Sequence, residues 1–376
     1  MEAKALPDLT VLFDLIEKFS RIVSITGYEY MAEPYLRQII VEDFNGVFDE
    51  VYFDKFGSCH LLKKGARKIG GVKKVMLDAH IDQIGLVVTE ILDGGFLRVK
   101  SLGGLDRNIL IASEFYVYTK NYDDENPFIF SAGQRIPAIA VSIPPHLKNT
   151  KNIKGNDLPK LEDLYLDTGY DSKEELEKTV KIGSPVSFKS DFLKLENNLA
   201  ASAALDDRLC ALILMLAVKS ITNLNNTPDV DVHVVLSAGE ESSGTGAAAS
   251  AYAIQPDFAV VLDAGFAQGP EIDASGAFEI GKGAGISYSA ATNMTLTKKV
   301  ISLAKEKKLA LNAIAEPSGT GTNADTIQIT GEGIPCVLLS LPLKNMHAFN
   351  EICSVQDVEE TVKIVAEIIQ NAGNLI

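Results

Sequence analysis

Apolar residues recur at helical spacing near the start of the chain, over residues 9–19 and 31–41, so both segments are predicted to form helices. Residues 51–62 have an extended pattern. Short apolar runs at residues 75–77 and 84–88 predict two strands, and the first run ends just before an Asp-Ala-His sequence. The N-terminal part is therefore expected to contain two helices followed by strands.

The pattern changes between about residues 96 and 192, where short runs of β type alternate with Gly, Pro, Asn and Asp. We interpret this region as a small all-β domain, residues 91–190, inserted into a larger domain. Within it, the polar stretch at residues 148–157 is expected to be an exposed loop.

After residue 205 the helical and strand patterns alternate, which is typical of a mostly parallel sheet with helices on both faces. The predicted elements are a helix with the apolar stripe Leu205, Leu209, Leu212 and Leu216, strands at 232–236, 258–262 and 336–341, a helix near 297–307, and a last helix opened by the capping-box sequence Ser354-Val355-Gln356-Asp357. The expected fold class is α/β, a mostly parallel-type mixed sheet flanked by helices, formed by residues 1–90 and 191–376.

Composition narrows the class of protein. A length of 376 residues suggests about two domains, and 46% hydrophobic with 23% charged residues is ordinary for a globular protein. The net charge of −15, without clustered Lys and Arg, argues against a nucleic-acid partner.

The four cysteines lie far apart and form no CxxC pair, so neither a disulfide framework nor a thiolate zinc site is predicted. The first residues lack the apolar core of a secretory signal, and no stretch approaches the ~20 apolar residues that a membrane span needs. We expect a cytoplasmic protein without membrane contact.

Residues of metal-ligand type follow the ends of four predicted strands. Ligands of open α/β sheets bind outside the carboxyl ends of the strands. The residues at these ends are His80, Glu240, Glu241, Asp263 and His347, and Asp206 opens the long helix. Each alone has an ordinary explanation, such as a helix cap or a solvated loop. Together, two imidazoles and three carboxylates at one sheet edge, with the Glu240–Glu241 pair counted as one position, form a suitable ligand set for paired metals such as zinc.

Two local patterns add detail. His80 and Asp82 are two residues apart, which points both side chains of an extended chain to one face. Asp82 is therefore expected to accept a hydrogen bond from the non-ligating nitrogen of His80, although an exposed strand pair is the alternative. Glu240 and Glu241 are adjacent, so their side chains should diverge, one suited to hold a metal and the other to handle a proton.

Five segments resemble the motifs of the tetrahedral (TET) aminopeptidases, a family of glutamyl, lysyl and deblocking aminopeptidases with a co-catalytic two-metal site. The segments are MLDAHIDQIG (76–85), ALDDR (204–208), GEESSGTGA (239–247), VLDAG (261–265) and MHAFNEI (346–352). Weaker similarity spans nearly the whole chain. The resemblance implies a zinc-exopeptidase-like catalytic domain with an inserted β dimerisation domain, and dimers that assemble into a dodecamer.

The resemblance also implies which residues bind each metal ion. His80 and Asp263 would bind one divalent ion, and Asp206 would bridge to a second. Glu241 and His347 would complete the second site. The two ions are expected to be zinc, with cobalt or manganese as alternatives.

By the same resemblance, Glu240 occupies the general-base position, and Asp82 and Asp207 are supporting residues. The peptide bond between the two aspartates of the ALDDR motif is often cis in this family. The implied activity is that of a metal-dependent hydrolase, an aminopeptidase that removes N-terminal residues from peptides.

Four positions depart from the family pattern. Gln83 stands where an acid is usual, Ala203 where lysine, Gly239 where glutamine, and Asn323 where aspartate. None is an implied metal ligand, so the departures bear on substrate preference, activity and oligomer contacts.

Other functions remain as alternatives. A deacylase or related amidohydrolase would use the same two-metal site, and a catalytically weak binding homologue belongs to a different class. A glycosidase fits less well, because the chain has no Trp for sugar stacking and the adjacent Glu240 and Glu241 should not flank a glycosidic bond at ~5–9 Å.

Overall fold

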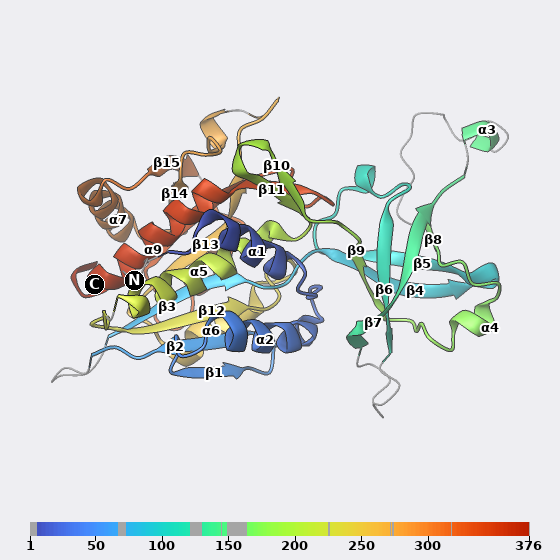
Figure 1. The fold of residues 1–376 in the computed structure, drawn as a ribbon, viewed down its shortest axis with the longest axis horizontal. Helices are drawn as coiled ribbons and strands as arrows, with labels where there is room; N and C mark the ends of the chain where they lie inside the picture. The colour runs from blue at the N-terminus through green and yellow to red at the C-terminus, as the bar shows by residue number, and fades with distance from the viewer. Residues whose placement is uncertain are drawn as a thin grey trace.

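The computed structural model describes residues 6–66, 73–120, 130–143, 145–148, 164–224, 226–270, 272, 274–316 and 318–375. Figure 1 shows an α/β part that contains both marked chain ends, and a β-rich part beside it that contains β4–β9. The predicted loop at 148–157 lies outside the described residues, apart from Lys148 at the end of the short helix α3 (Pro145–Lys148).

The α/β part contains an eleven-stranded mixed sheet, as the fold-class prediction stated. Its strands are β1 (Glu50–Phe53), β2 (Cys59–Lys63), β3 (Lys74–His80), β10 (Leu193–Leu195), β11 (Leu199–Ser202), β12 (Asp231–Ser237), β13 (Phe258–Phe266), β14 (Ala284–Ser289), β15 (Leu311–Glu316), β16 (Cys336–Lys344) and β17 (Glu351–Ser354). The order is β1-β2-β12-β3-β13-β16-β17-β11-β10, with β14 paired to β15 and β16. The central strands β12, β3, β13 and β16 are mutually parallel, so their carboxyl ends meet at one edge.

The extended pattern predicted at residues 51–62 is a hairpin rather than one strand. β1 and β2 pair antiparallel, with Val51 opposite Leu61. The Asp54 carboxylate accepts hydrogen bonds from the backbone N–H groups of Phe56 and Ser58, which stabilises the turn between the two strands.

Helices cover both faces of the sheet (Figure 1). They are α1 (Leu9–Ser20), α2 (Glu33–Asp43), α5 (Leu205–Asn223), α6 (Thr245–Ile254), α7 (Met294–Lys307), α8 (Ala324–Ile327) and α9 (Val355–Leu375). Side chains of α1, α5 and α9 pack into one apolar cluster with strand residues such as Leu77 and Val234, while α6 and α8 pack with Met76 and Val235 on the opposite face. Successive strand residues point to opposite faces, which produces this division.

The helix α5 is buried on all sides, although the sequence predicted one apolar stripe. Sixteen of its residues are buried, because it lies between the sheet and the helices α1 and α9. At the start of α9, Ser354 accepts a hydrogen bond from the N–H of Asp357, as a capping residue should. The Asp357 carboxylate does not complete the capping box, because it accepts hydrogen bonds from the N–H groups of Gly281 and Gly283 instead.

The second part is a closed six-stranded barrel, the small all-β domain that the sequence predicted. Its strands are β4 (Gly85–Leu92), β5 (Phe96–Leu102), β6 (Glu114–Lys120), β7 (Phe130–Val141), β8 (Tyr165–Asp167) and β9 (Pro185–Phe188), and it also carries α4 (Lys173–Leu176). Leu86, Leu97, Phe115, Val117 and Val186 are among the buried residues of its own core. Closure leaves the barrel without an open sheet edge.

Two expectations from composition can be compared with the structure. All four cysteines are free and buried. In the described part of the chain, every helix is too short or too polar to cross a lipid bilayer.

Candidate metal centre

Four parallel strands bring the predicted ligands to one edge of the sheet. His80 is the last residue of β3 and lies opposite Ser237, the last residue of β12. Asp263 lies in the carboxyl half of β13, and His347 follows the end of β16. Glu240 lies in the loop after β12. The strand-end positions read from the sequence therefore meet in space, because neighbouring parallel strands end together.

Five side chains form two groups that share Asp206. The first group is His80, Asp206 and Asp263, and the second is Asp206, Glu241 and His347; within each group the ligand atoms lie within 4.8 Å of one another. The Nε2 atom of His80 is 3.3 Å from Oδ1 of Asp206 and 3.8 Å from Oδ1 of Asp263. The Nε2 atom of His347 is 3.3 Å from Oδ2 of Asp206 and 3.4 Å from Oε1 of Glu241. Asp206 thus presents one oxygen to each group.

The second ring nitrogens of both histidines are held by backbone carbonyls. Nδ1 of His80 lies 3.0 Å from the carbonyl oxygen of Asp82, and Nδ1 of His347 lies 2.8 Å from that of Gly104. A carbonyl oxygen only accepts, so each Nδ1 donates, and once the Nε2 proton is displaced by a metal each ring would direct the lone pair of Nε2 towards Asp206. Metal-binding histidines are oriented in this way.

The electrostatics of the two groups fit a cation. Oδ1 of Asp206 is buried without a hydrogen-bond partner. Asp206 and Glu241 raise the pKa of His347 to about 11. Burial lowers the pKa of His80, but the carboxylates of Asp206 and Asp82 outweigh it and raise that pKa well above its usual value. A cation would offset the same concentration of negative charge, and a set of imidazole and carboxylate donors suits a divalent metal such as zinc.

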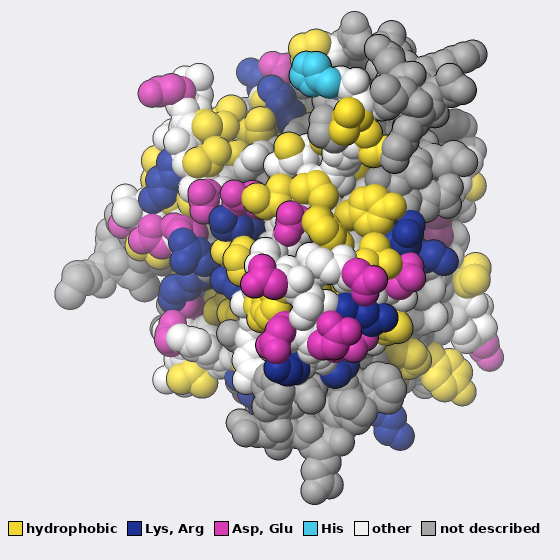
Figure 2. Space-filling model, turned by 90° about the vertical axis from the view of Figure 1, so that its right-hand side faces the viewer, with side chains coloured by type: hydrophobic (Ala, Val, Ile, Leu, Met, Phe, Trp, Pro, Cys, Tyr) yellow, Lys and Arg dark blue, Asp and Glu magenta, His cyan; other side chains and the backbone are white. Residues whose placement is uncertain are grey.

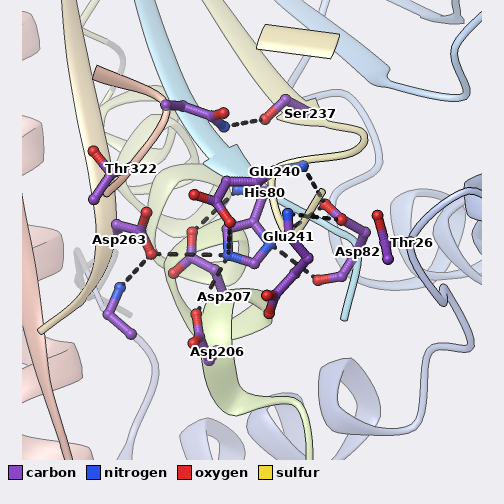
Figure 3. A network of polar contacts seen from close by, with 12 residues as sticks. Thr26, His80, Asp82, Asp206, Asp207, Ser237, Glu240, Glu241, Asp263 and Thr322 are labelled. Carbon is purple, nitrogen blue, oxygen red and sulfur yellow. Dashed lines mark hydrogen bonds and ion pairs between the residues drawn. The ribbon is translucent and has the colours of Figure 1, made fainter. Parts of the chain in front are cut away.

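The Asp82 carboxylate lies beside the non-ligating nitrogen of His80, as expected, with Oδ1 at 3.5 Å from Nδ1, and it also holds the glutamate loop. The carboxylate accepts hydrogen bonds from the backbone N–H groups of Glu240, at 3.1 Å, and Glu241, at 3.2 Å (Figure 3). The shorter contact of the same ring nitrogen is with the backbone carbonyl of Asp82, at 3.0 Å. The contact with the glutamate loop could not be predicted from local spacing, because this loop is remote in sequence from Asp82. Asp82 therefore positions the glutamate pair.

The two glutamates diverge, as predicted from their adjacency. Glu241 belongs to the second ligand group, whereas Glu240 belongs to neither and has Oε2 at 3.8 Å from Nε2 of His80. Burial raises the pKa of Glu240 to about 7, and the charge of Glu241 contributes in the same direction. Their loop turns tightly, because Gly239 and Gly244 adopt positive φ angles of 72° and 65°. Glu240 is thus a carboxylate beside the two ligand groups, able to exchange a proton.

The backbone of the ligands is also held in place. Asp207 accepts a hydrogen bond from the N–H of His80 at 3.1 Å, and the Asp206–Asp207 peptide bond is cis, as the resemblance implies. The sequence reasoning missed Glu351, whose buried carboxylate accepts from the N–H groups of Asp206, at 3.0 Å, and His347, at 2.8 Å. Burial raises the pKa of Glu351 to about 8. Glu351 lies in the MHAFNEI segment, and this position was the sequence signal that could have identified it as a functional residue.

The departures from the family pattern lie outside both ligand groups. Gln83 accepts a hydrogen bond from the buried side chain of Arg208. Asn323 donates to the buried Asp78 carboxylate at 2.8 Å. Ala203 is buried in the apolar cluster of the barrel. These residues support the surroundings of the centre rather than its ligands.

The other three histidines also lie outside the ligand groups, as predicted. His60 is buried, with Nε2 at 3.1 Å from Oδ2 of Asp54. His233 is half-buried on β12, and His146 is exposed on α3.

A cavity of about 440 Å³ opens over the two ligand groups. Its floor includes His80, Asp206 and His347. Apolar side chains form much of its remaining wall, namely Phe266, Phe278, Ile314, Leu338 and Met346. A small molecule with an apolar body can therefore reach the candidate metal centre.

An α/β sheet with two groups of candidate metal ligands that share one carboxylate under a cavity is typical of metal-dependent hydrolases, the metallopeptidases among them. The chain belongs to the M42 glutamyl aminopeptidase family, whose model matches residues 57–364. It is accordingly an aminopeptidase of the M42 metallopeptidase family, which confirms the resemblance to the TET aminopeptidases.

Individual proteins agree with this assignment. The chain is 29% identical over 359 residues to a lysyl aminopeptidase of Pyrococcus furiosus, covering 95% of this chain and 96% of that protein. It is similar to the crystal structure of a TET aminopeptidase from Thaumarchaeota archaeon SCGC AB-539-E09, with a TM-score of 0.85, 25% identity and coverage of 96% and 97%. The TET1 peptidase of Pyrococcus horikoshii, which can assemble into a tetrahedron or a large octahedral shell, gives a TM-score of 0.79, 25% identity and coverage of 95% and 99%.

Proposed function

We propose that this protein hydrolyses the N-terminal residue from peptides with two divalent metal ions, and that it acts in the cytoplasm, where its buried thiols stay reduced. The observation that carries the proposal is the pair of ligand groups joined by Asp206. His80 and Asp263 would hold one ion with Asp206, and Glu241 and His347 would hold the other. Zinc suits the donors best, with cobalt or manganese as alternatives.

Glu240 is the general base in this proposal. Its carboxylate lies beside both ligand groups without belonging to either, and burial brings its pKa near 7. Such a group can take a proton from the attacking water and pass it to the leaving amine. Asp82 keeps Glu240 in place by accepting its backbone N–H.

Two bound divalent ions would supply Lewis-acid activation of the water and of the scissile carbonyl. The chain itself supplies the cavity, whose apolar wall would bury the side chain of the N-terminal residue. The two ions would offer a site for the neutral α-amine of a peptide, whose lone pair an acylated nitrogen lacks. This preference separates an aminopeptidase from a deacylase.

A comparison of aminoacyl anilides with N-acyl amino acids tests the proposal against both alternatives. We expect hydrolysis of the anilides only. Hydrolysis of the N-acyl compounds alone would assign the same centre to a deacylase. A protein that stays inert towards both after loading with zinc or cobalt would be a binding homologue.

We further propose that the cavity prefers a basic N-terminal residue. Among the residues that line it, Glu316 is the one ionisable side chain outside the two ligand groups and Glu240. Oε1 of Glu316 accepts a hydrogen bond from Ser287 at 2.9 Å, which orients the carboxylate. Apolar walls with one carboxylate suit the long stem and charged end of lysine or arginine.

Glu316→Gln is expected to lower kcat/KM for a lysyl anilide by roughly tenfold, about 1.4 kcal/mol, because the attraction between opposite charges is lost. The kcat/KM for a leucyl anilide should change little, and it serves as the matched control substrate. An equal loss on both substrates would instead mean that Glu316 supports the cavity without selecting the residue.

We also propose that the inserted barrel domain, near residues 91–190, forms a dimer contact and that dimers can assemble further. Figure 2 faces the end of the molecule that carries the barrel and shows apolar side chains gathered across it, among acidic and basic ones. Large exposed apolar residues of this domain include Ile111, Ile139 and Ile182. The solved relatives that form shells or dodecamers support a second copy as the occupant.

Sedimentation should therefore show a dimer or a larger assembly of the wild-type protein. Ile139→Lys is expected to weaken association, because a charge would be buried at the contact. Val41→Lys, at an exposed position on α2, is the control and should leave the assembly unchanged. A monomer at every accessible concentration would contradict the proposal.

A further inference from the structure

A second cavity, of about 380 Å³, lies between the α/β part and the barrel. It shares no lining residue with the cavity over the ligand groups. Its wall comes from the segment after α1, from β6, β7 and β9 of the barrel, and from the start of α5. Nothing in the proposed peptidase reaction uses it.

The most unusual group in this wall is the guanidinium of Arg208, which is 1% exposed. It donates to the carbonyl oxygen of Ser20 at 3.1 Å and to the side-chain oxygen of Gln83. Both partners are neutral, and Nε has no hydrogen-bond partner. Burial lowers the pKa of Arg208 to about 10, so the group still carries its charge at neutral pH.

The nearest carboxylates do not neutralise this charge directly. Asp82 uses its two oxygens to accept the N–H groups of Glu240 and Glu241. Glu351 uses both of its own for the N–H groups of Asp206 and His347. Among the described residues, no carboxylate oxygen forms an ion pair within 4.0 Å of the Arg208 guanidinium. A buried charge without a carboxylate partner lowers the stability of the fold. An external anion that pairs with Arg208 would therefore stabilise the protein.

The rest of the cavity suits an anion that carries an apolar body. Arg21 and Arg135 also line it, against one acidic residue, Asp191. Arg21 pairs with Glu17 outside the cavity, and the Arg135 guanidinium lies 3.9 Å above the ring of Tyr116. Aromatic side chains complete the wall, namely Tyr35, Tyr116, Tyr118, Phe188 and Phe192.

We propose that this cavity binds a small organic carboxylate, whose charged end pairs with Arg208 and whose apolar body packs against the aromatic wall. Arginine binds carboxylates through short, charge-assisted hydrogen bonds. Gln83 is the feature that leaves the site open, because a carboxylate at this position would pair with Arg208 from within the chain.

The binding can be measured by thermal unfolding and calorimetry of the full-length, metal-loaded protein at constant ionic strength. The probe is 3-phenylpropionate, with the uncharged 3-phenylpropionamide as its control and inorganic phosphate as a second anion. We expect a saturable rise in unfolding temperature with the carboxylate only. No saturable binding, or equal stabilisation by the amide or by phosphate, would overturn the proposal.

The variant Gln83→Glu distinguishes carboxylate binding in this cavity from carboxylate binding at the metal centre. The new carboxylate should pair with Arg208, so the unliganded protein should unfold at a higher temperature and the response to 3-phenylpropionate should disappear. Gln356→Glu makes the same charge change at an exposed position in the first turn of α9 and should keep the response. If the response of Gln83→Glu equals that of the wild type, the carboxylate binds elsewhere and the assignment is wrong.

Discussion

Replacement of Glu240 by glutamine is expected to lower kcat by ~10²–10⁴-fold while both metal ions stay bound. Glutamine keeps the shape of the side chain but cannot accept the proton of the attacking water. Glu240 lies outside both ligand groups, so its loss should not release metal. Steady-state kinetics on an aminoacyl anilide, together with metal analysis of the same preparation, measure both quantities.

The neighbouring Glu241→Gln is the matched control. Glu241 belongs to the second ligand group, with Oε1 at 3.4 Å from Nε2 of His347. A neutral amide in place of an anionic ligand should weaken metal binding, and excess metal should partly restore the activity of this variant. Near wild-type turnover of Glu240→Gln, or its rescue by added metal, would mean that the base and ligand roles of the pair are wrongly assigned.

Removal of metal by a chelator is expected to abolish activity, and zinc, cobalt or manganese should restore it. The reason is the charge of the centre, where Oδ1 of Asp206 is buried without a partner and both histidine Nε2 atoms face this carboxylate. Metal should also stabilise the fold, by about 4 kcal/mol when its concentration is a thousand times Kd. Full activity in excess chelator, with metal loss verified, would contradict a metal-dependent mechanism.

The metal content of histidine variants distinguishes the two ligand groups. His347→Ala should reduce the metal content from two ions to one, because His80, Asp206 and Asp263 remain for the first ion. His233→Ala, at a half-buried histidine of β12 outside both groups, should keep two. Unchanged stoichiometry in His347→Ala would remove His347 from the ligand set.

Most of the architecture could be predicted from the local pattern of apolar and polar residues along the chain. The strands that became β12, β13 and β16 were visible as apolar runs, and the polar residues after them pointed to one sheet edge. This worked because a parallel sheet converts the position of a residue along its own strand into a position in space. The all-round burial of α5 was not visible, because its apolar stripe does not reveal that α1 and α9 cover its other side.

The sequence by itself determined which residue types stand at the strand ends, and with them His80, Asp206, Glu241, Asp263 and His347 as metal-ligand candidates. Only the tertiary structure decided how these side chains are held. The Asp82 carboxylate holds the glutamate loop as well as lying beside the His80 ring, and Glu351 holds the backbones of two ligands. Three of these four hydrogen bonds join residues more than a hundred positions apart, and local periodicity carries no information about such distances.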